Sequence, residues 1–157
     1  MLGLLSLNMS TLPYLTPEDE HSASGTTTFG AMAIVATPAG VVLHLRDDKP
    51  GIPHPACWSL FGGAMDDGEL PDETIRRELR EELDLHEVTL RALWRVVDMD
   101  GDGRRLTIFE ARTPRYAREM TLAEGQALGV FDLASALELR LAAFCRRSLL
   151  RYAASQA

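Results

Sequence analysis

The sequence predicts an α/β fold, with elements in the order hairpin, helix, hairpin, strand, helix. Two pairs of apolar, partly β-branched runs, each pair joined by a turn-forming segment, predict the hairpins. Between them lies a charged segment with apolar residues at every fourth position, which predicts an amphipathic helix. At 157 residues the chain is most simply one domain, large enough to bury a core.

The first hairpin is predicted from two runs, Thr28–Thr37 and Val41–Arg46, which are joined by a Pro-Ala-Gly segment. Asp47–Pro55 carries three prolines and a glycine, so it is expected to be a loop. Trp58–Phe61 then reads as a short strand that ends at a glycine pair, Gly62 and Gly63.

The central helix is expected to begin near Pro71, because proline suits a first turn whose N–H groups lack partners. Ile75, Leu79 and Leu83 recur at every fourth position and form its apolar stripe. The remaining elements are two strands around a DGDG turn, a loop that becomes a strand, a short helix and a longer helix: Val88–Met99, Arg105–Arg112, Glu124–Phe131, Leu133–Leu141 and Ala142–Ala154.

Carboxylates gather on one side of the central helix. Glu78 and Glu82 have no basic residue three or four positions away, and each is the other's i,i+4 neighbour. Like charges at that spacing repel, and the repulsion increases beside an apolar stripe where water is scarce. A bound Mg²⁺ or Mn²⁺ would relieve it, since both cations prefer oxygen ligands. The alternative is a solvated acidic helix face.

The surrounding residues resemble the Nudix box, the sequence motif of the Nudix hydrolases. In that motif a glycine is followed at fixed spacing by a glutamate and then by a charged helix that ends in a glycine and an aliphatic residue. The matching positions are Gly63, Glu69, Arg77, Glu78, Leu79, Arg80, Glu81, Glu82, Leu83 and Leu85. One fixed position departs, because Asp84 replaces the glycine that ends the helix, and Asp is among the few residues that tolerate a left-handed conformation.

The resemblance implies an α/β/α sandwich, with a mixed β-sheet between the box helix and the C-terminal helix. It also implies a Mg²⁺ or Mn²⁺ site and a set of catalytic carboxylates. The implied metal ligands are the Gly62 carbonyl, Glu78, Glu81 and Glu82; the implied catalytic residues are Glu78, Glu81 and the downstream Glu124; the implied brace between loop and helix is Glu69 with Arg77.

Two residues are expected to contact substrate. Arg46 ends a strand where similar enzymes place a phosphate-contacting arginine, and its forked guanidinium suits a phosphate. Trp58 is either a base-stacking wall or a core residue. His44, His54 and His86 show no metal-ligand spacing and receive no role.

The implied activity is metal-dependent hydrolysis of a phosphoanhydride in a nucleoside diphosphate linked to another moiety. A nucleoside triphosphate, including an oxidised one, is the first expectation for the substrate, and a sugar nucleotide or dinucleotide is the alternative. The motif recognises only the diphosphate. A Nudix-like domain that binds nucleotide without hydrolysing it, and a purely structural domain with a solvated acidic face, are the alternatives outside enzymes.

Composition constrains the partners. A net charge of −7 argues against nucleic-acid binding, which favours a basic face. The apolar opening MLGLLSLNM is short and lacks a basic region, so neither a signal peptide nor a membrane span is expected, and Met9 is an alternative start. Two cysteines without pairing spacing indicate a reducing cytoplasm. Residues 1–25 are expected to form a loosely ordered lead-in and residues 26–157 the domain, with monomer and homodimer both open.

Overall fold

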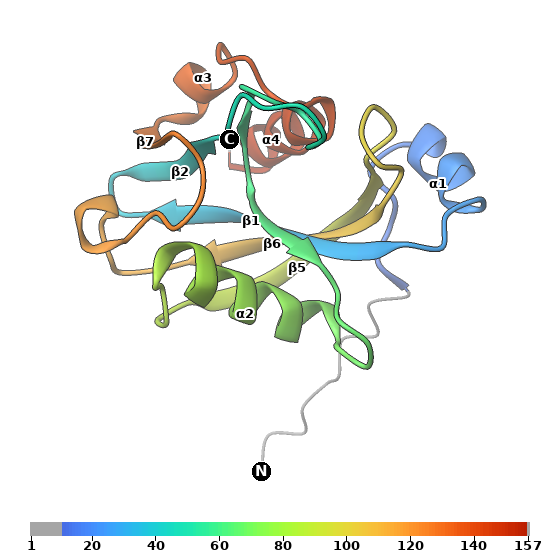
Figure 1. The fold of residues 1–157 in the computed structure, drawn as a ribbon, viewed down its shortest axis with the longest axis horizontal. Coiled ribbons are helices and arrows are strands. Elements are labelled where there is room, and N and C mark those ends of the chain that lie inside the picture. The colour runs from blue at the N-terminus through green and yellow to red at the C-terminus, as the bar shows by residue number, and fades with distance from the viewer. Residues whose placement is uncertain (1–10, 157) are drawn as a thin grey trace.

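A seven-stranded mixed β-sheet forms the centre of the molecule, with helices on both faces (Figure 1). The computed structural model describes residues 11–156. The strands are β1 (Phe29–Thr37), β2 (Gly40–Leu45), β3 (Trp58–Ser59), β4 (Phe61–Ala64), β5 (Thr89–Val97), β6 (Arg105–Arg112) and β7 (Ala127–Phe131). The helices are α1 (Pro17–Ala23), α2 (Pro71–Leu83), the 3₁₀ helix η2 (Ala117–Glu119), α3 (Leu133–Ala136) and α4 (Ala143–Gln156).

Strand β1 organises the sheet because it has three partners. Along one edge its residues 29–36 run parallel to β6. Its other edge is divided: residues 30–33 pair with β4 and residues 35–37 pair with β2, both antiparallel. The sheet therefore forks at Ile34. Beyond the fork, β2 lies between β3 and β7, and on the far side of the sheet β5 pairs with β6.

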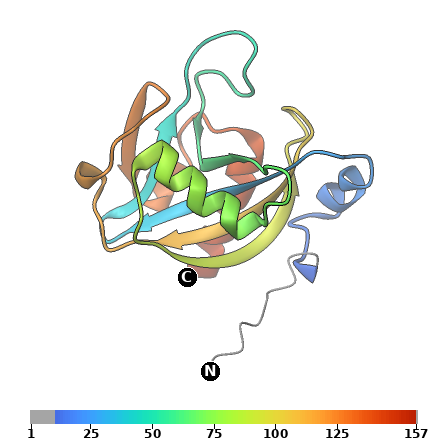
Figure 2. The ribbon, with the colours of Figure 1, turned by 60° about the horizontal axis from the view of Figure 1, so that its bottom comes forward.

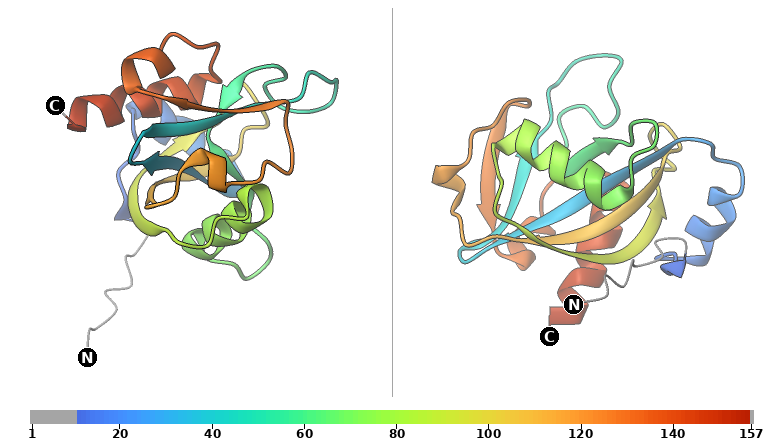
Figure 3. Two further views of the ribbon diagram at one scale, coloured as in Figure 1. Left: turned by 90° about the vertical axis from the view of Figure 1, so that its left-hand side faces the viewer. Right: turned by 90° about the horizontal axis from the view of Figure 1, so that it is seen from below.

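The two faces of β1 bury different side chains, as the period of two along a strand requires. Ala31, Ala33 and Val35 face helix α2, whose apolar stripe packs on them. Met32 and Ile34 face the opposite core, which helix α4 covers. Figure 2 shows α2 lying in front of the sheet, and the right panel of Figure 3 shows the strands passing between α2 and α4. The small alanines let α2 approach the sheet closely.

The predicted α/β/α arrangement is confirmed, as are both hairpins, the central helix, the last strand and the C-terminal helix. One predicted element differs. The strand expected at residues 58–61 is two strands, since β3 pairs with β2 while β4 pairs with β1. The chain changes partner at the fully buried Leu60, where it crosses the fork, and the Leu60 N–H donates to Cys145 Sγ at 3.4 Å.

Part of the expected lead-in is a helix. Thr16 caps the N-terminus of α1 by accepting from the Asp19 N–H, and proline occupies the first turn. Asp19 is fully buried and accepts from the Val97 N–H at 3.0 Å and from Arg147 Nη2 at 2.9 Å. Loose order is therefore wrong for residues 17–23. The segment Met1–Met9 lies outside the described residues.

No helix within residues 11–156 combines the length and the apolar character that a membrane crossing requires.

Helix α2 ends as the sequence predicts, at a left-handed residue. Asp84 has φ 52° and ψ 37°, and its N–H donates to the Arg80 carbonyl at 3.0 Å. The next N–H, of Leu85, reaches back to the Leu79 carbonyl at 3.2 Å, so the chain closes in a Schellman-type turn.

Asp84→Gly is expected to raise the free energy of unfolding by up to about 1 kcal/mol, because glycine adopts this conformation without steric strain. The exposed pair that Asp84 makes with His86 at 2.7 Å contributes little to offset the gain. Thermal melts measure the change. Asp84→Ala is the matched control: it removes the same charge but keeps a Cβ, and it should give no rise. A rise in both variants would show that charge, and not backbone strain, is responsible.

Candidate active site

The acidic face of α2 lies at the border of its buried stripe. Glu82 is adjacent to the buried Leu83, and its Oε2 is buried without a hydrogen-bond partner among the described residues. Burial, and then the neighbouring Glu78 carboxylate, raise the pKa of Glu82 to about 9, although the Gly62 N–H favours the ionised form. Glu81, one residue earlier, is 58% exposed. The three acids therefore sit in different environments on one helix.

The glycine pair lets the backbone approach these acids. A Cβ at Gly63 would lie 2.7 Å from Glu78 Oε1, so a larger residue would push the carboxylate away. Gly62 has φ 146°, and a Cβ there would collide with the Ala31 carbonyl on β1. Glycine at both positions therefore lets the backbone of β4 lie directly against the Glu78 carboxylate.

Arg77 joins the loop before the helix to the helix itself. Its Nε donates to Glu69 Oε2 at 2.8 Å and its Nη2 to Glu69 Oε1 at 3.0 Å, a forked pair. Its Nη1 donates to Glu78 at 3.0 Å and to Glu81 at 3.2 Å. The Arg77 guanidinium, with help from the Asp66 N–H, lowers the pKa of Glu69 to about 2.

One expectation about Glu78 needs correction. The sequence has no basic residue three or four positions from Glu78, which predicted that Glu78 has no cationic partner. The adjacent Arg77 nevertheless contacts the Glu78 carboxylate. Glu78 therefore has a cationic partner, and Glu82 has none among the described residues.

A loop far along the sequence brings a fourth acid to this place. The N–H groups of Thr121 and Ala123 donate to the last carbonyls of α2, on Leu83 and Glu82, at 3.0 and 2.9 Å. The Gln126 N–H donates to the Leu45 carbonyl at the end of β2, at 2.7 Å. The loop is thus fixed between the helix end and β2, and Glu124 lies between these attachments. Spacing along the chain does not relate residue 124 to the helix, and only the resemblance to the Nudix hydrolases indicated Glu124 in advance.

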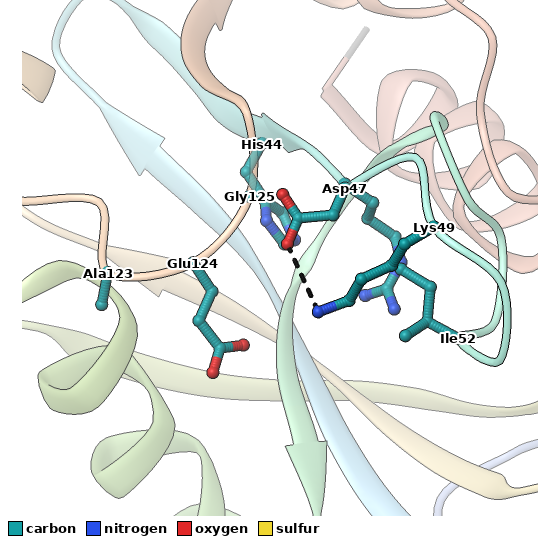
Figure 4. A pocket seen from close by; sticks show the side chains of 8 residues that line it. His44, Asp47, Lys49, Ile52, Ala123, Glu124 and Gly125 are labelled. Carbon is teal, nitrogen blue, oxygen red and sulfur yellow. Dashed lines mark ion pairs between the residues drawn. The ribbon is translucent and has the colours of Figure 1, made fainter.

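Glu124 faces a cavity of about 340 Å³ that we name the loop cavity. Figure 4 shows the Glu124 side chain on one side of it and Lys49 and Asp47, which form an ion pair at 3.9 Å, on the other. The lining residues are His44, Arg46, Asp47, Lys49, Ile52, Ala123, Glu124 and Gly125. The cavity therefore combines two cations with three potential hydrogen-bond acceptors.

A second cavity, of about 210 Å³, opens beside the glycine pair, and we name it the glycine cavity. Across it, His54 Nε2 lies 2.8 Å from Asp98 Oδ1, which joins the proline-rich loop to the turn between β5 and β6. Its walls also include the apolar side chains of Met32, Leu106 and Phe144. Arg46 lines both cavities.

The two residues expected to bind substrate have different positions. Arg46 Nε donates to the Pro53 carbonyl at 2.8 Å, and its two terminal nitrogens have no hydrogen bond within the described residues, so they remain available to a ligand. Trp58 lines neither cavity: its ring meets Phe131 edge-on at 5.1 Å and packs against the core beneath α4. The contacts of Trp58 support its alternative reading as a core residue.

Sequence reasoning left several cavity residues without a role. His44 lies on β2, two positions before Arg46, which directly follows the strand, so the period of two could have indicated it. His54 could not have been found in this way, because its partner Asp98 belongs to a different hairpin.

The residues fit a divalent cation in their chemistry. Glu82 carries a buried, unpartnered oxygen beside Glu78, and a bound cation would remove the mutual repulsion. Within residues 11–156, however, no three His, Cys, Asp or Glu side chains are already grouped around a cation position. The donor set is therefore suitable but not preassembled, and Arg77 holds part of it.

A sequence model described as the NUDIX domain matches residues 26–151. The chain belongs to the Nudix family. Members of this family are pyrophosphohydrolases, so the chain is one as well. Membership does not specify its substrate or its metal. A comparison with curated protein sequences gave no match.

Solved Nudix structures share the fold at low identity. A mutT/nudix family protein from Listeria innocua is 24% identical, with a TM-score of 0.68 over 82% of this chain and 93% of its own. The NUDIX domain of Shewanella oneidensis NrtR, complexed with ADP ribose, is 19% identical, with a TM-score of 0.68 over 86% and 92%. The E. coli dihydroneopterin triphosphate pyrophosphohydrolase is 18% identical, with a TM-score of 0.61 over 79% and 93%.

Proposed function

We propose that this Nudix protein is a Mg²⁺- or Mn²⁺-dependent hydrolase of a phosphoanhydride bond in a nucleoside diphosphate linked to another moiety. The observation that carries the proposal is the loop cavity, where Lys49 lies across from Glu124 and Arg46 is a further lining residue. Glu124 is also close enough to the acidic face of α2 for its charge to raise the pKa of Glu82, which links the cavity to the proposed metal ligands. Two structural neighbours support the bond type: one is complexed with ADP ribose and one is named for dihydroneopterin triphosphate, and both compounds contain a phosphoanhydride bond.

Each residue has a distinct task in this proposal. The free terminal nitrogens of Arg46, with Lys49, bind the phosphate oxygens. Glu78, Glu82 and the Gly62 carbonyl hold the cation, with Glu81 as a further ligand. When bound, the cation supplies neutralisation of the charge on the bridging and leaving oxygens.

Glu124 is the base that we favour. Its carboxylate has no ion pair or hydrogen bond among the described residues, whereas Glu78 and Glu81 both pair with Arg77. A carboxylate without a cationic partner keeps its lone pairs available, so Glu124 can take a proton from the attacking water. Glu78 and Glu81 remain the alternatives.

The proposed substrates are those expected from the sequence: a nucleoside triphosphate, including an oxidised one, or a sugar nucleotide or dinucleotide. We propose a cytoplasmic location, because Cys57 and Cys145 are both unpaired and buried. Light scattering after size exclusion would distinguish monomer from homodimer.

A product assay tests the function. The purified protein is incubated with Mg²⁺ and a panel of nucleoside triphosphates, sugar nucleotides and dinucleotides, and both products of each are identified. Release of a nucleoside monophosphate, dependent on Mg²⁺ and lost in Glu124→Gln, is expected. A nucleotide that binds but is not cleaved under any metal condition would instead support the non-catalytic alternative.

Two variants separate the brace from the chemistry. Arg77→Ala is expected to lower both melting temperature and turnover, because it releases Glu69 from the helix. Glu81→Gln is expected to lower turnover about 10- to 100-fold, as loss of a metal-site group does, with little change in melting temperature. Arg77→Lys is the control that keeps the charge but loses the fork. Near-normal turnover in Glu81→Gln would exclude Glu81 from the chemistry.

A further inference from the structure

His44 occupies an unusual position for a histidine without a role. It lies on β2 with only 7% of its surface exposed, and its ring stacks on Phe61 at 4.6 Å between ring centres. Its Nε2 lies 3.0 Å from the Leu60 carbonyl oxygen. A carbonyl only accepts hydrogen bonds, so Nε2 must carry the proton of the imidazole.

The other ring nitrogen is therefore a bare acceptor. No described residue donates to Nδ1 of His44, although the residue lines the loop cavity. The space beside Nδ1 exists because residue 125 is glycine, whose φ is 96°; a Cβ there would lie 3.3 Å from Nδ1. Burial, above all, lowers the pKa of His44 to about 4, so the imidazole stays neutral near pH 7 and Nδ1 keeps its lone pair.

The cavity around Nδ1 determines which donor suits it. Arg46 and Lys49 suit the oxygens of a diphosphate, while Asp47, Glu124 and His44 all accept hydrogen bonds. A ligand that fits both sets carries phosphates and, next to them, hydroxyl groups. A third, terminal phosphate is ionised at neutral pH and offers only hydrogen-bond acceptors. It therefore fits poorly against Asp47, Glu124 and His44, which are acceptors as well.

We propose that His44 is a specificity-determining residue whose Nδ1 accepts a hydrogen bond from a hydroxyl group on the moiety attached to the diphosphate. This inference rests on the proposed function, and it selects a hydroxyl-bearing partner such as a sugar over a third phosphate. His44 takes no proton in the reaction; it orients and selects the ligand.

Nitrogen NMR of ¹⁵N-labelled protein tests the tautomer without any variant. The ring nitrogens of His44 are expected to show a protonated Nε2 and an unprotonated Nδ1 at pH 7. Adding ADP-ribose, without added metal, should shift the Nδ1 resonance, since that atom gains a donor. The methyl ester of ADP, which keeps both phosphates but has no hydroxyl beyond them, should leave Nδ1 in place. A protonated Nδ1 in the free protein would overturn the proposal.

Two substitutions divide the functions of the two nitrogens. His44→Gln can still donate to the Leu60 carbonyl but loses the acceptor at Nδ1; His44→Asn keeps an acceptor there and loses the donor. Calorimetric titration of His44→Gln is expected to give a three- to tenfold loss of ADP-ribose affinity, the range of one hydrogen bond, with the ester within twofold. His44→Asn should melt lower but recover the preference. His86→Gln, remote from the cavity, is the control and should match the parent.

The results separate this inference from the function. Equal loss of both ligands in His44→Gln, or ADP-ribose binding that leaves Nδ1 unchanged, would overturn the role of His44 even if the protein hydrolyses nucleotides. A shifted Nδ1 with no hydrolysis of any nucleotide would keep the role of His44 and overturn the proposed activity. Failure of the parent protein to bind ADP-ribose at all would also overturn the role of His44.

Discussion

Replacing Glu82 with glutamine is expected to reduce turnover by about 100- to 1000-fold without destabilising the metal-free protein. A metal ligand contributes several kcal/mol of charge stabilisation, and each 1.4 kcal/mol corresponds to a factor of ten. Stability should be kept or raised, because glutamine has nearly the same shape and removes a carboxyl group that must take up a proton when the chain folds near pH 7. Steady-state kinetics and thermal melts on the same preparations measure both effects.

The contribution of Glu82 to the free energy of unfolding depends on pH, and the raised pKa gives the direction of that dependence. The pKa of Glu82 is raised from its ordinary value of 4.5 to about 9, so between these values the folded protein binds more protons than the unfolded chain. Without metal, its contribution to stability is most favourable below pH 4.5 and declines as pH rises toward 9. Glu82→Gln should lose that decline. Adding Mg²⁺ should raise the melting temperature of the parent protein, more so at higher pH, but not that of Glu82→Gln.

An equal response to Mg²⁺ in the parent and in Glu82→Gln would place the metal elsewhere. Glu73→Gln is a suitable control, because Glu73 is an exposed acid on the same helix that accepts from the Leu70 N–H outside the acidic face. It should retain both the metal response and turnover.

Replacing Asp19 with alanine is expected to lower the free energy of unfolding by about 3–5 kcal/mol, the range for breaking a buried ion pair from one side. Asp19 is fully buried, and its loss leaves the Val97 N–H without its acceptor and the Arg147 guanidinium without its carboxylate partner, although Arg147 keeps its bond to the Val97 carbonyl. For a chain of this size, such a change lowers the melting temperature by roughly 6–20 °C. Thermal or urea unfolding monitored by circular dichroism measures it.

Asp19→Asn should be milder, because an amide oxygen can still accept from the Val97 N–H. Glu18→Ala, an exposed neighbour in the same helical turn, is the matched control and should stay close to the parent. If Asp19→Ala melts together with Glu18→Ala, then α1 is attached to the domain by other contacts.

The architecture was predictable because its signals are local. Periodic apolar residues, the proline at the start of α2 and the αL residue at its end all act within a few positions, and each lies where the sequence indicates. The start of α1 was local as well: Thr16, a proline and three acids form an ordinary helix N-terminus. The helix was not predicted because the polar composition of residues 11–25 is typical of a loosely ordered segment. Only the tertiary contacts of the buried Asp19, with Val97 and Arg147, show that it is fixed to the domain.

The site was predictable only where one helix carries it. Glu78, Glu81 and Glu82 share α2, so their spacing was sufficient to group them. The contacts that build the two cavities join separate elements: Ala123 to Glu82, His54 to Asp98 and Gln126 to Leu45. Such contacts depend on how the sheet forks and how the loops cross it, and no spacing along the chain reports them. The packing of Trp58 against Phe131 depends in the same way on the pairing of β3 with β2, and its expected role in substrate binding stays a prediction.

The parallel pairing of β1 with β6 has a consequence for how the protein folds. These strands are adjacent in the sheet, yet β2, β4, α2 and β5 all lie between them in the sequence. Nonlocal pairing of this kind slows folding, to roughly milliseconds to seconds. During synthesis, α2 leaves the ribosome before β6 exists to complete the surface beneath it. Until then the apolar stripe of α2 lacks the β6 side chains, Phe109 and Ala111, that share its core. Stopped-flow refolding followed by the fluorescence of the buried Trp94 should therefore show no native signal before the slow phase.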